Sequence, residues 1–254
     1  MDDPAPPPPE PAPEQPRGGE LVRRHSAVTR LWHWLNVVVV TVLLMSGLMI
    51  FNAHPRLYWG QFGANADRAW LELPENDGMA FPGWATLPSD YSLADARLWH
   101  LAFAWLLALG LLGFLAWGLV RGHIRRDLHI SLSEWRPAHL WHDIKQHARL
   151  RFPTGVAAPR YNALQKIAYC GVLFGLLPLM IATGLAMSPG IDPAMPWLVD
   201  LLGGRQSARS LHFLAAAGLV VFFVAHIVMV VLAGPIDEVR SMITGWYRLP
   251  EERP

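Results

Sequence analysis

The chain has 254 residues, of which 52% are hydrophobic and only 16% are charged. Soluble domains carry about 25% charged residues, so this composition argues against a water-soluble globule. The formal net charge is +1, which leaves no basic excess for binding nucleic acid. The single cysteine, Cys170, excludes an intramolecular disulfide, a zinc site built from cysteines and an iron–sulfur cluster held by four thiolates.

The N-terminal segment, residues 1–20, holds eight prolines and almost no apolar side chains. Such a composition cannot bury a core, so it predicts a disordered proline-rich tail. The segment also lacks the apolar stretch and the small-residue cleavage site of a secretory signal peptide. The folded domain is therefore expected to follow it, at residues 21–250.

Four long stretches free of Asp, Glu, Lys and Arg occur after the tail, at residues 31–55, 98–120, 167–191 and 210–236. A helix needs about 20 residues to cross the roughly 30 Å hydrocarbon core of a bilayer, and each stretch exceeds that length. The competing interpretation, two long soluble helical hairpins, does not account for apolar runs this long. We therefore expect an all-α membrane protein, a bundle of four transmembrane helices in the lipid bilayer. Its expected spans are residues 31–51, 98–120, 164–187 and 210–233.

Lysine and arginine are distributed unevenly between the two ends of these spans. Sixteen of the 21 lie before the first charge-free stretch, between the second and third, or after the fourth, and five lie on the opposite side. Cytoplasmic segments carry the excess of positive charge. Both termini and the 121–163 loop are therefore expected in the cytoplasm, and the 52–97 loop on the external side.

Four histidines lie within the spans, although an ionisable side chain inside a bilayer is costly and by default suggests a function. On the fourth span, His212 and His226 are 14 residues apart, so they share a helix face and lie about 21 Å apart along its axis. The directions of the spans pair His100 with His212 near the external surface and His33 with His226 near the cytoplasm. For each histidine alone, a hydrogen bond to a neighbouring carbonyl is the alternative.

Each of the two levels thus offers two facing imidazoles and no nearby acid within the spans. Zinc prefers four ligands, whereas two axial imidazoles hold a haem iron with no open position, which suits electron transfer. The pairs predict two haems, with His33, His100, His212 and His226 as axial iron ligands. Because the chain has no C-x-x-C-H attachment motif, the haems are expected to be b-type and non-covalently bound.

An arginine precedes three of these histidines by three residues, at Arg30, Arg97 and Arg209. At this spacing the two side chains share a helix face, with the arginine one turn nearer the water, where haem propionates are expected to emerge. A guanidinium pairs well with a carboxylate, so we expect these arginines to bind the propionates. The alternative is that arginine and tryptophan only mark the membrane interface here.

With these motifs the chain resembles the bacterial cytochrome b561 / nickel–iron hydrogenase b-type cytochrome superfamily, which includes formate dehydrogenase gamma subunits and thiosulfate reductase cytochrome b subunits. The resemblance covers residues 23–246. Its most specific elements are R-x-x-H-W at 30–34, the histidine that opens the second span, and H-x13-H on the fourth. It implies a four-helix, cytochrome b561-like domain in the bacterial inner membrane, with four histidines holding two b haems in the same pairing.

The sequence Y-N-A-L-Q-K at 161–166 is similar to Y-N-A-G-Q-K of formate dehydrogenase gamma subunits, which lies near the quinone pocket beside the cytoplasmic haem. The similarity implies that Asn162, Gln165 and Lys166 bind a quinone, which would be an exchangeable substrate. Leu164 replaces the glycine of that motif, so contacts made by the glycine backbone do not carry over. The alternative is a polar helix N-terminus capped by Asn162, and the two interpretations are compatible.

Two further segments, F-P-G-W-A-T-L-P at 81–88 and R-S-M-I-T-G at 240–245, resemble the branch found beside periplasmic molybdopterin oxidoreductases. No molybdenum or flavin domain fits in the chain, so the chemistry on the final substrate is expected in a partner subunit. The leading hypothesis is a dihaem cytochrome b subunit that transfers electrons between a periplasmic, molybdopterin-dependent oxidoreductase and the quinone pool. The alternatives are a free-standing cytochrome b561 that oxidises a small external reductant, and a haem-free transporter or anchor.

Overall fold

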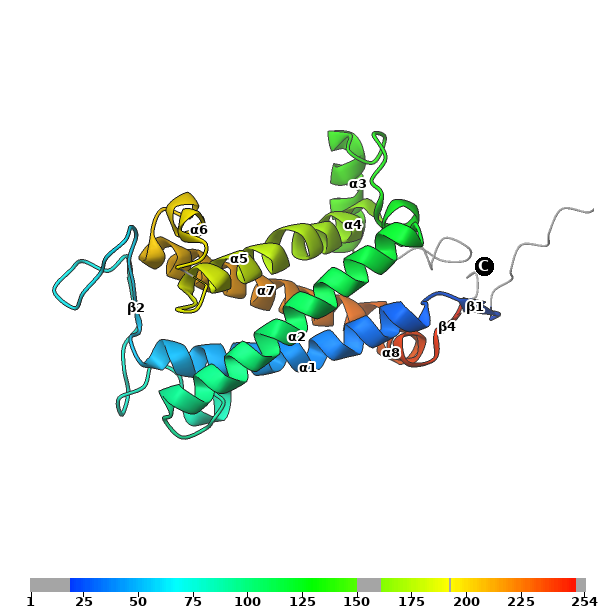
Figure 1. The fold of residues 1–254 in the computed structure, drawn as a ribbon. Coiled ribbons are helices and arrows are strands. Elements are labelled where there is room, and N and C mark those ends of the chain that lie inside the picture. Colours follow the sequence, from blue (N-terminus) through cyan, green and yellow to red (C-terminus); the bar gives the residue numbers. More distant parts are fainter. Residues whose placement is uncertain (1–18, 150–160, 192, 250–254) are drawn as a thin grey trace, which may run out of the picture.

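The computed structural model describes residues 19–149, 161–191 and 193–249, so most of the expected proline-rich tail lies outside the described residues. Within them, four helices are long and apolar enough to cross a membrane, and they lie along one another as an elongated bundle (Figure 1). The helical membrane bundle predicted from the charge-free stretches is therefore confirmed. The helices are α1 (Ala27–Asn52), α2 (Leu93–Val120), the composite helix Ala163–Met187 and α7 (Arg205–Ala233).

The first two long helices begin before their charge-free stretches, because serine caps start them in a polar segment. Ser26 accepts a hydrogen bond from the backbone N–H three residues later, at 3.1 Å, and Ser92 does the same at 3.4 Å. Such caps satisfy N–H groups that have no partner inside the helix. As a result, His33 and His100 lie about two turns inside their helices.

The third span is one continuous helix with a wider turn in its middle. It comprises α4 (Ala163–Cys170), η4 (Gly171–Leu176) and α5 (Leu177–Met187). At the end of η4, the N–H of Leu177 bonds to the carbonyl of Val172, five residues back. Pro178 follows directly. Proline lacks an N–H and clashes with the carbonyl four residues earlier in a regular helix, so the wide turn accommodates it without breaking the span.

Two apolar clusters hold the bundle together. One joins α1, α2 and the third span, and its buried members are Val39, Leu43, Leu107, Leu111, Phe114, Leu128, Leu173 and Leu177. The other joins α5, α6 (Pro196–Leu201) and α7, and its buried members are Ala186, Leu198, Val199 and Ala208. Only 6% of the most apolar stretch of α7 is buried, so the rest of the described chain leaves most of this stretch uncovered.

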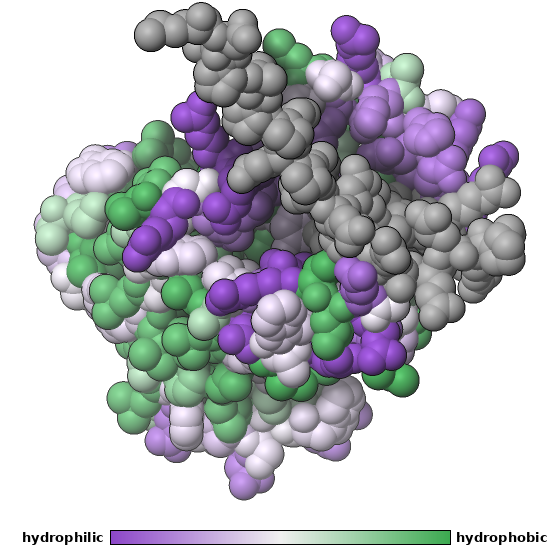
Figure 2. Space-filling view, turned by 90° about the vertical axis from the view of Figure 1, so that its right-hand side faces the viewer, coloured by the Kyte–Doolittle hydropathy of each residue, from purple (hydrophilic) through white to green (hydrophobic). Residues whose placement is uncertain are grey.

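Short antiparallel strands join the chain at both ends of the bundle. At one end β1 (Leu21–Arg23) pairs with β4 (Trp246–Arg248), which follows α8 (Pro235–Thr244). At the other end β2 (Arg56–Leu57) pairs with β3 (Leu71–Glu72) between α1 and α2 (Figure 1). Figure 2 looks onto the β1–β4 end, where hydrophilic residues gather beside a hydrophobic periphery. The described segments nearest the two termini therefore lie at one polar end.

The segment between α2 and the third span, expected as a loop, contains two short helices. They are η2 (Ile124–Leu128) and α3 (Pro137–Ala148), and α3 projects away from the bundle (Figure 1). The charged residues and histidines of this segment exclude a membrane span, but a polar segment can still form a helix at the surface. The remainder of this segment, residues 150–160, lies outside the described residues. The segment between α1 and α2 also contains one turn of 3-10 helix, η1 (Gly83–Ala85).

Candidate functional site

The four histidines within the spans lie in two facing pairs, as the sequence analysis predicts. The ring centroids of His100 on α2 and His212 on α7 are 6.2 Å apart, with the ring planes inclined at 60°. The centroids of His33 on α1 and His226 on α7 are also 6.2 Å apart, with an angle of 57°. Because His212 and His226 lie about four turns apart on one helix, the pairs occupy two levels. We call them the outer pair (His100, His212) and the inner pair (His33, His226).

The geometry of both pairs fits a metal ion held between two imidazoles. A bond from a metal to an imidazole nitrogen is about 2 Å long, and the ring centroid lies about 1 Å farther away, so two axial imidazoles have centroids roughly 6 Å apart. The separations of 6.2 Å agree with this value. Among the described residues, no group of three or more His, Cys, Asp and Glu side chains could hold a bare metal ion. The residues present fit a haem iron at each level, and the ligand roles stay predictions.

Two buried hydroxyl groups that the sequence analysis did not single out contact the outer pair. Ser46 Oγ on α1 lies 3.0 Å from Nδ1 of His100. Thr183 Oγ1 on α5 lies 2.8 Å from Nδ1 of His212. Partners of this kind orient metal-binding imidazoles and fix their tautomer. In both helices a Gly-Leu dipeptide follows the hydroxyl residue, a repeat that could have identified them in the sequence.

The three arginines predicted to bind propionates have different surroundings. Arg209 donates hydrogen bonds to two backbone carbonyls in the segment after α1, one of them at 3.1 Å. Arg30 donates to the carbonyl of Ile243 in α8, and Arg97 is exposed near the start of α2. Arg209 therefore links α7 to the segment after α1, and Arg30 links α1 to α8. Propionate binding by all three arginines stays a prediction.

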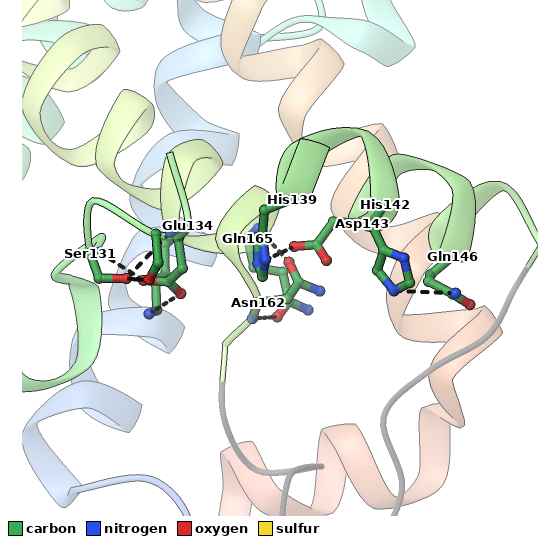
Figure 3. A network of polar contacts seen from close by, with 10 residues as sticks. Ser131, Glu134, His139, His142, Asp143, Gln146, Asn162 and Gln165 are labelled. Carbon is green, nitrogen blue, oxygen red and sulfur yellow. Dashed lines mark hydrogen bonds and ion pairs between the residues drawn. The ribbon is translucent and has the colours of Figure 1, made fainter. Parts of the chain in front are cut away.

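The residues predicted to bind a quinone organise the start of the third span. Asn162 Oδ1 accepts a hydrogen bond from Gln165 N at 2.9 Å, and Gln165 Oε1 accepts one from Asn162 N at 3.1 Å, which forms a capping box. Lys166 forms an ion pair with Glu134 at 2.7 Å. Figure 3 shows the capping box of Asn162 and Gln165, with α3 beside it. The alternative interpretation, a capped helix N-terminus, is confirmed, and quinone binding by these residues stays a prediction.

The Glu134 carboxylate anchors the segment after η2 to the third span. Burial opposes its ionisation, but hydrogen bonds from Lys166 and Ser131 outweigh burial and lower the pKa of Glu134 to about 2. The backbone N–H and the hydroxyl of Ser131 donate to one carboxylate oxygen, at 2.8 and 2.9 Å. The Glu134 carboxylate is therefore ionised at neutral pH, and its contacts with Lys166 and Ser131 hold this segment against the third span.

A series of aromatic rings connects the start of the third span with the inner pair. Tyr161 contacts Tyr169 with ring centroids 5.2 Å apart, Tyr169 contacts Phe222 at 6.3 Å, and Phe222 stacks on His226 at 5.9 Å. Burial raises the pKa of the Tyr161 hydroxyl, so this group keeps its proton at neutral pH. No pattern in the sequence marks this series, because the contact between Tyr169 and Phe222 joins two separate helices.

Polar side chains also join the ends of α1 and α8 near the inner pair. The Arg24 guanidinium donates to both carboxylate oxygens of Glu238, at 2.9 and 2.8 Å, and lies 4.7 Å above the Tyr247 ring. His25, directly after Arg24, is only 7% exposed. Burial, with a smaller effect of the Arg24 charge, lowers the pKa of His25 to about 4, so the side chain is neutral at pH 7. These contacts set the position of the first turns of α1, which carry His33.

The chain is similar over most of its length to several known proteins. The chain is 30% identical over 216 residues to a putative protein-methionine-sulfoxide reductase subunit, YedZ1, of Azospira oryzae, a match that covers 84% of this chain and 92% of the relative. It is 26% identical over 257 residues to a probable Ni/Fe-hydrogenase B-type cytochrome subunit of Azotobacter vinelandii, covering 93% and 95%. It is also 26% identical over 238 residues to the putative cytochrome YdhU of Escherichia coli, covering 91% and 76%.

A protein-family comparison covers almost all of the described chain. Residues 24–245 match the family described as prokaryotic cytochrome b561. The match includes all four long helices and both histidine pairs. Membership implies b-type haem and a role in membrane electron transport. The chain therefore belongs to the prokaryotic cytochrome b561 family, as a multi-pass membrane protein.

Proposed function

We propose that this chain is a dihaem cytochrome b subunit that transfers electrons between an oxidoreductase on the external side of the membrane and the quinone pool. The observation that carries the proposal is the presence of two histidine pairs with the same 6.2 Å spacing at two levels of one bundle. Haem bound at such sites supplies one-electron redox chemistry. His33, His100, His212 and His226 would hold the two haems, and sites with two imidazole ligands each would leave no position for oxygen or a substrate.

The separation of the two sites suits transfer across the membrane. His212 and His226 place them about 21 Å apart along α7, a large part of the roughly 30 Å hydrocarbon core. In the proposed orientation, α7 would hold one site toward each surface of the membrane. The proposed topology has both termini in the cytoplasm of a bacterial cell, with the inner pair near that side of the inner membrane, in keeping with the excess of Lys and Arg there.

The proposed partner is a periplasmic oxidoreductase of the molybdopterin-dependent type, which carries out the substrate chemistry. The support is the long segment between α1 and α2, whose β2–β3 hairpin extends beyond the bundle (Figure 1). This segment exposes large aromatic side chains, and Phe62 and Trp84 are each 84% exposed. Relatives are named as subunits of a methionine-sulfoxide reductase and of Ni/Fe-hydrogenases, which agrees with an electron-transfer chain that works with a separate catalytic subunit.

The proposed quinone site lies at the cytoplasmic end, beside the start of the third span, and gives the chain quinone reductase or quinol oxidase activity there. The aromatic series from His226 through Phe222 and Tyr169 to Tyr161 joins the inner pair to this place. The protonated Tyr161 hydroxyl is suited to donate a hydrogen bond to a quinone carbonyl. The remaining polar groups of the proposed site come from Asn162, Gln165 and Lys166.

Haem analysis of the purified full-length protein tests this function. Pyridine haemochrome measurement is expected to give about two b haems per chain, one for each histidine pair, and added quinone is expected to reoxidise the reduced haems. A fully loaded preparation with a single haem would overturn the dihaem assignment. A protein without haem would instead support a transporter or anchor, and reduction by a small external reductant without any quinone exchange would support a free-standing cytochrome.

A further inference from the structure

Matching hydroxyl groups on two different helices hold the two imidazoles of the outer pair. Ser46 Oγ lies 3.0 Å from His100 Nδ1, and Thr183 Oγ1 lies 2.8 Å from His212 Nδ1. Both hydroxyl residues are completely buried, with 0% of their surface exposed. Each buried hydroxyl therefore contacts a ring that is proposed to bind iron, in addition to the backbone of its own helix.

A glycine beside each hydroxyl residue lets the ring approach the helix. A Cβ atom on Gly47 would lie 3.3 Å from His100 Cε1, and one on Gly184 would lie 3.6 Å from His212 Cε1. The first distance is closer than ordinary van der Waals contact. Each outer imidazole therefore presents its Nδ1–Cε1 edge to a hydroxyl–glycine pair, on α1 for His100 and on α5 for His212.

The hydrogen atoms of both hydroxyl groups are already used in other bonds. Ser46 Oγ donates to the carbonyl of Val42 at 2.7 Å, and Thr183 Oγ1 donates to the carbonyl of Leu179 at 2.6 Å. A hydroxyl has one hydrogen to donate, so toward the imidazole each oxygen acts as an acceptor. Nδ1 of each outer histidine therefore carries the hydrogen, and Nε2 keeps the lone pair with which a neutral imidazole binds a metal.

The inner pair lacks this arrangement. Nδ1 of His33 is buried and has no hydrogen-bond partner among the residues that the structure describes. The other inner ring, His226, is stacked on Phe222. A hydrogen bond from the second ring nitrogen raises the basicity of a metal-binding imidazole, and hydrogen bonding around the ligands shifts haem potentials. The two sites thus differ in a feature that changes the balance between oxidised and reduced iron.

We propose that Ser46 and Thr183 are positioning residues that lower the reduction potential of the outer haem relative to the inner haem. This inference rests on the dihaem function proposed above. A more basic imidazole stabilises ferric iron more than ferrous iron, so the outer pair favours the oxidised state. With haem bound at both sites, the two hydroxyls would favour transfer of one electron from the outer to the inner site, which would oxidise the outer iron and reduce the inner one. The chain is therefore biased to carry electrons inward, from an external oxidoreductase as donor to a quinone as acceptor.

Potentiometric titration of the full-length, haem-loaded protein tests the proposal with Ser46→Ala and Thr183→Val. Each variant is expected to raise the midpoint potential of the same haem component, the one that is lost in His100→Ala, and to leave the other component unchanged. The conservative variants Ser46→Thr and Thr183→Ser keep the hydroxyl and are expected to have the wild-type potential. Thr41→Val is the matched control, because Thr41 donates the same type of bond to a carbonyl four residues earlier, at 2.7 Å, but its side chain is exposed.

Two results would overturn the proposal. One is an unchanged outer potential in both Ser46→Ala and Thr183→Val while two haems remain bound. The other is an equal shift of both components, which would show a general disturbance of the bundle. The absence of two haems from the wild-type protein would overturn the proposed function instead, and it is detected before any substitution is made.

A variant that keeps the size of the side chain covers the case in which Ser46→Ala loses the outer haem. In Ser46→Cys the sulfur accepts hydrogen bonds only weakly, so this variant is expected to retain the haem and to show a raised outer potential. A wild-type outer potential in Ser46→Cys would overturn the role of the Ser46 hydrogen bond. A midpoint potential of the outer haem in Ser46→Cys that lies between the wild-type value and the Thr183→Val value would support this role of Ser46.

Discussion

The imidazole of His226 stacks on the ring of Phe222, with centroids 5.9 Å apart and planes inclined at only 15°. Phe222 in turn contacts Tyr169 edge-on at 6.3 Å. One phenylalanine therefore joins the inner histidine pair to the third span. The contact gives the proposed quinone site a defined position relative to the inner pair, so this end of the bundle is where the proposed function is most directly tested.

The pairing of the histidines predicts which variants lose the same haem. His100→Ala and His212→Ala are expected to remove one component of a potentiometric titration, and His33→Ala and His226→Ala the other. The reason is that the rings of each pair face one another at 6.2 Å, so removal of either ring leaves one protein ligand. If His33→Ala and His212→Ala removed the same component, the pairing would be wrong.

A substitution at Asn162 tests the quinone site. Asn162→Leu is expected to slow the reoxidation of reduced haem by added quinone, while both haem spectra and reduction by the external donor remain intact. Leucine also removes the N-cap of the third span, and loss of a cap costs about 1 kcal/mol. Stopped-flow measurement of haem reoxidation, together with thermal unfolding, records both effects.

A capping residue at the same position separates the two effects. Asn162→Ser keeps an oxygen that can cap the helix but removes the amide. This variant is expected to unfold at nearly the wild-type temperature and still to exchange electrons slowly with quinone. Wild-type quinone kinetics in both variants would place the site elsewhere, most simply at the outer haem near Arg97 and Trp99.

The buried His25 predicts a pH dependence of stability. Burial, reinforced by Arg24, lowers its pKa in the folded protein to about 4, whereas the unfolded chain takes up the proton near pH 6.5. Between these values the unfolded state binds more protons, so the free energy of unfolding falls as the pH falls, by up to about 1.4 kcal/mol per pH unit. Below about pH 4 this contribution changes no further.

Thermal unfolding across this pH range measures the effect. His25→Gln cannot titrate and is expected to reduce the loss of stability between about pH 6.5 and 4. His129→Gln is the control, because the His129 side chain is exposed, and its pH profile is expected to match the wild type. An unaltered slope in His25→Gln would show that other groups cause the pH dependence.

Two glycines on α2 predict opposite responses to alanine. A Cβ on Gly110 would lie 2.8 Å from Cζ3 of Trp32, and the Trp32 ring is stacked on Phe114 at 5.2 Å. Gly110→Ala is therefore expected to destabilise the protein by about 1–3 kcal/mol, as overpacked cores are. A Cβ on Gly113 would meet nothing within 4 Å, so Gly113→Ala is expected to be neutral or slightly stabilising, because alanine favours helix. Equal melting temperatures of the two variants would contradict this packing of α1 on α2.

The Y-N-A-L-Q-K motif at residues 161–166 shows which contacts at the start of the third span can be predicted from the sequence. The sequence predicts two roles for its polar residues, quinone binding and a helix cap; the structure confirms the cap formed by Asn162 and Gln165, and quinone binding stays a prediction. The ion pair of Lys166 with Glu134 was not foreseen, because it joins residues 32 positions apart. Capping depends on neighbours within one turn, whereas an ion pair between separate elements depends on how those elements pack.

Hydropathy, helical periodicity and the alternating direction of successive spans were sufficient to predict the four spans and the facing of His100 with His212 and of His33 with His226. The thickness of the bilayer sets the length of an apolar helix, 3.6 residues per turn set which side chains share its face, and the direction of each span sets the level of its histidine. The packing of the helices decided which groups surround each imidazole. Ser46 reaches a histidine 54 residues away, and Phe222 contacts Tyr169 from another helix. Such contacts depend on the rotation and separation of packed helices, which no pattern within a single helix specifies.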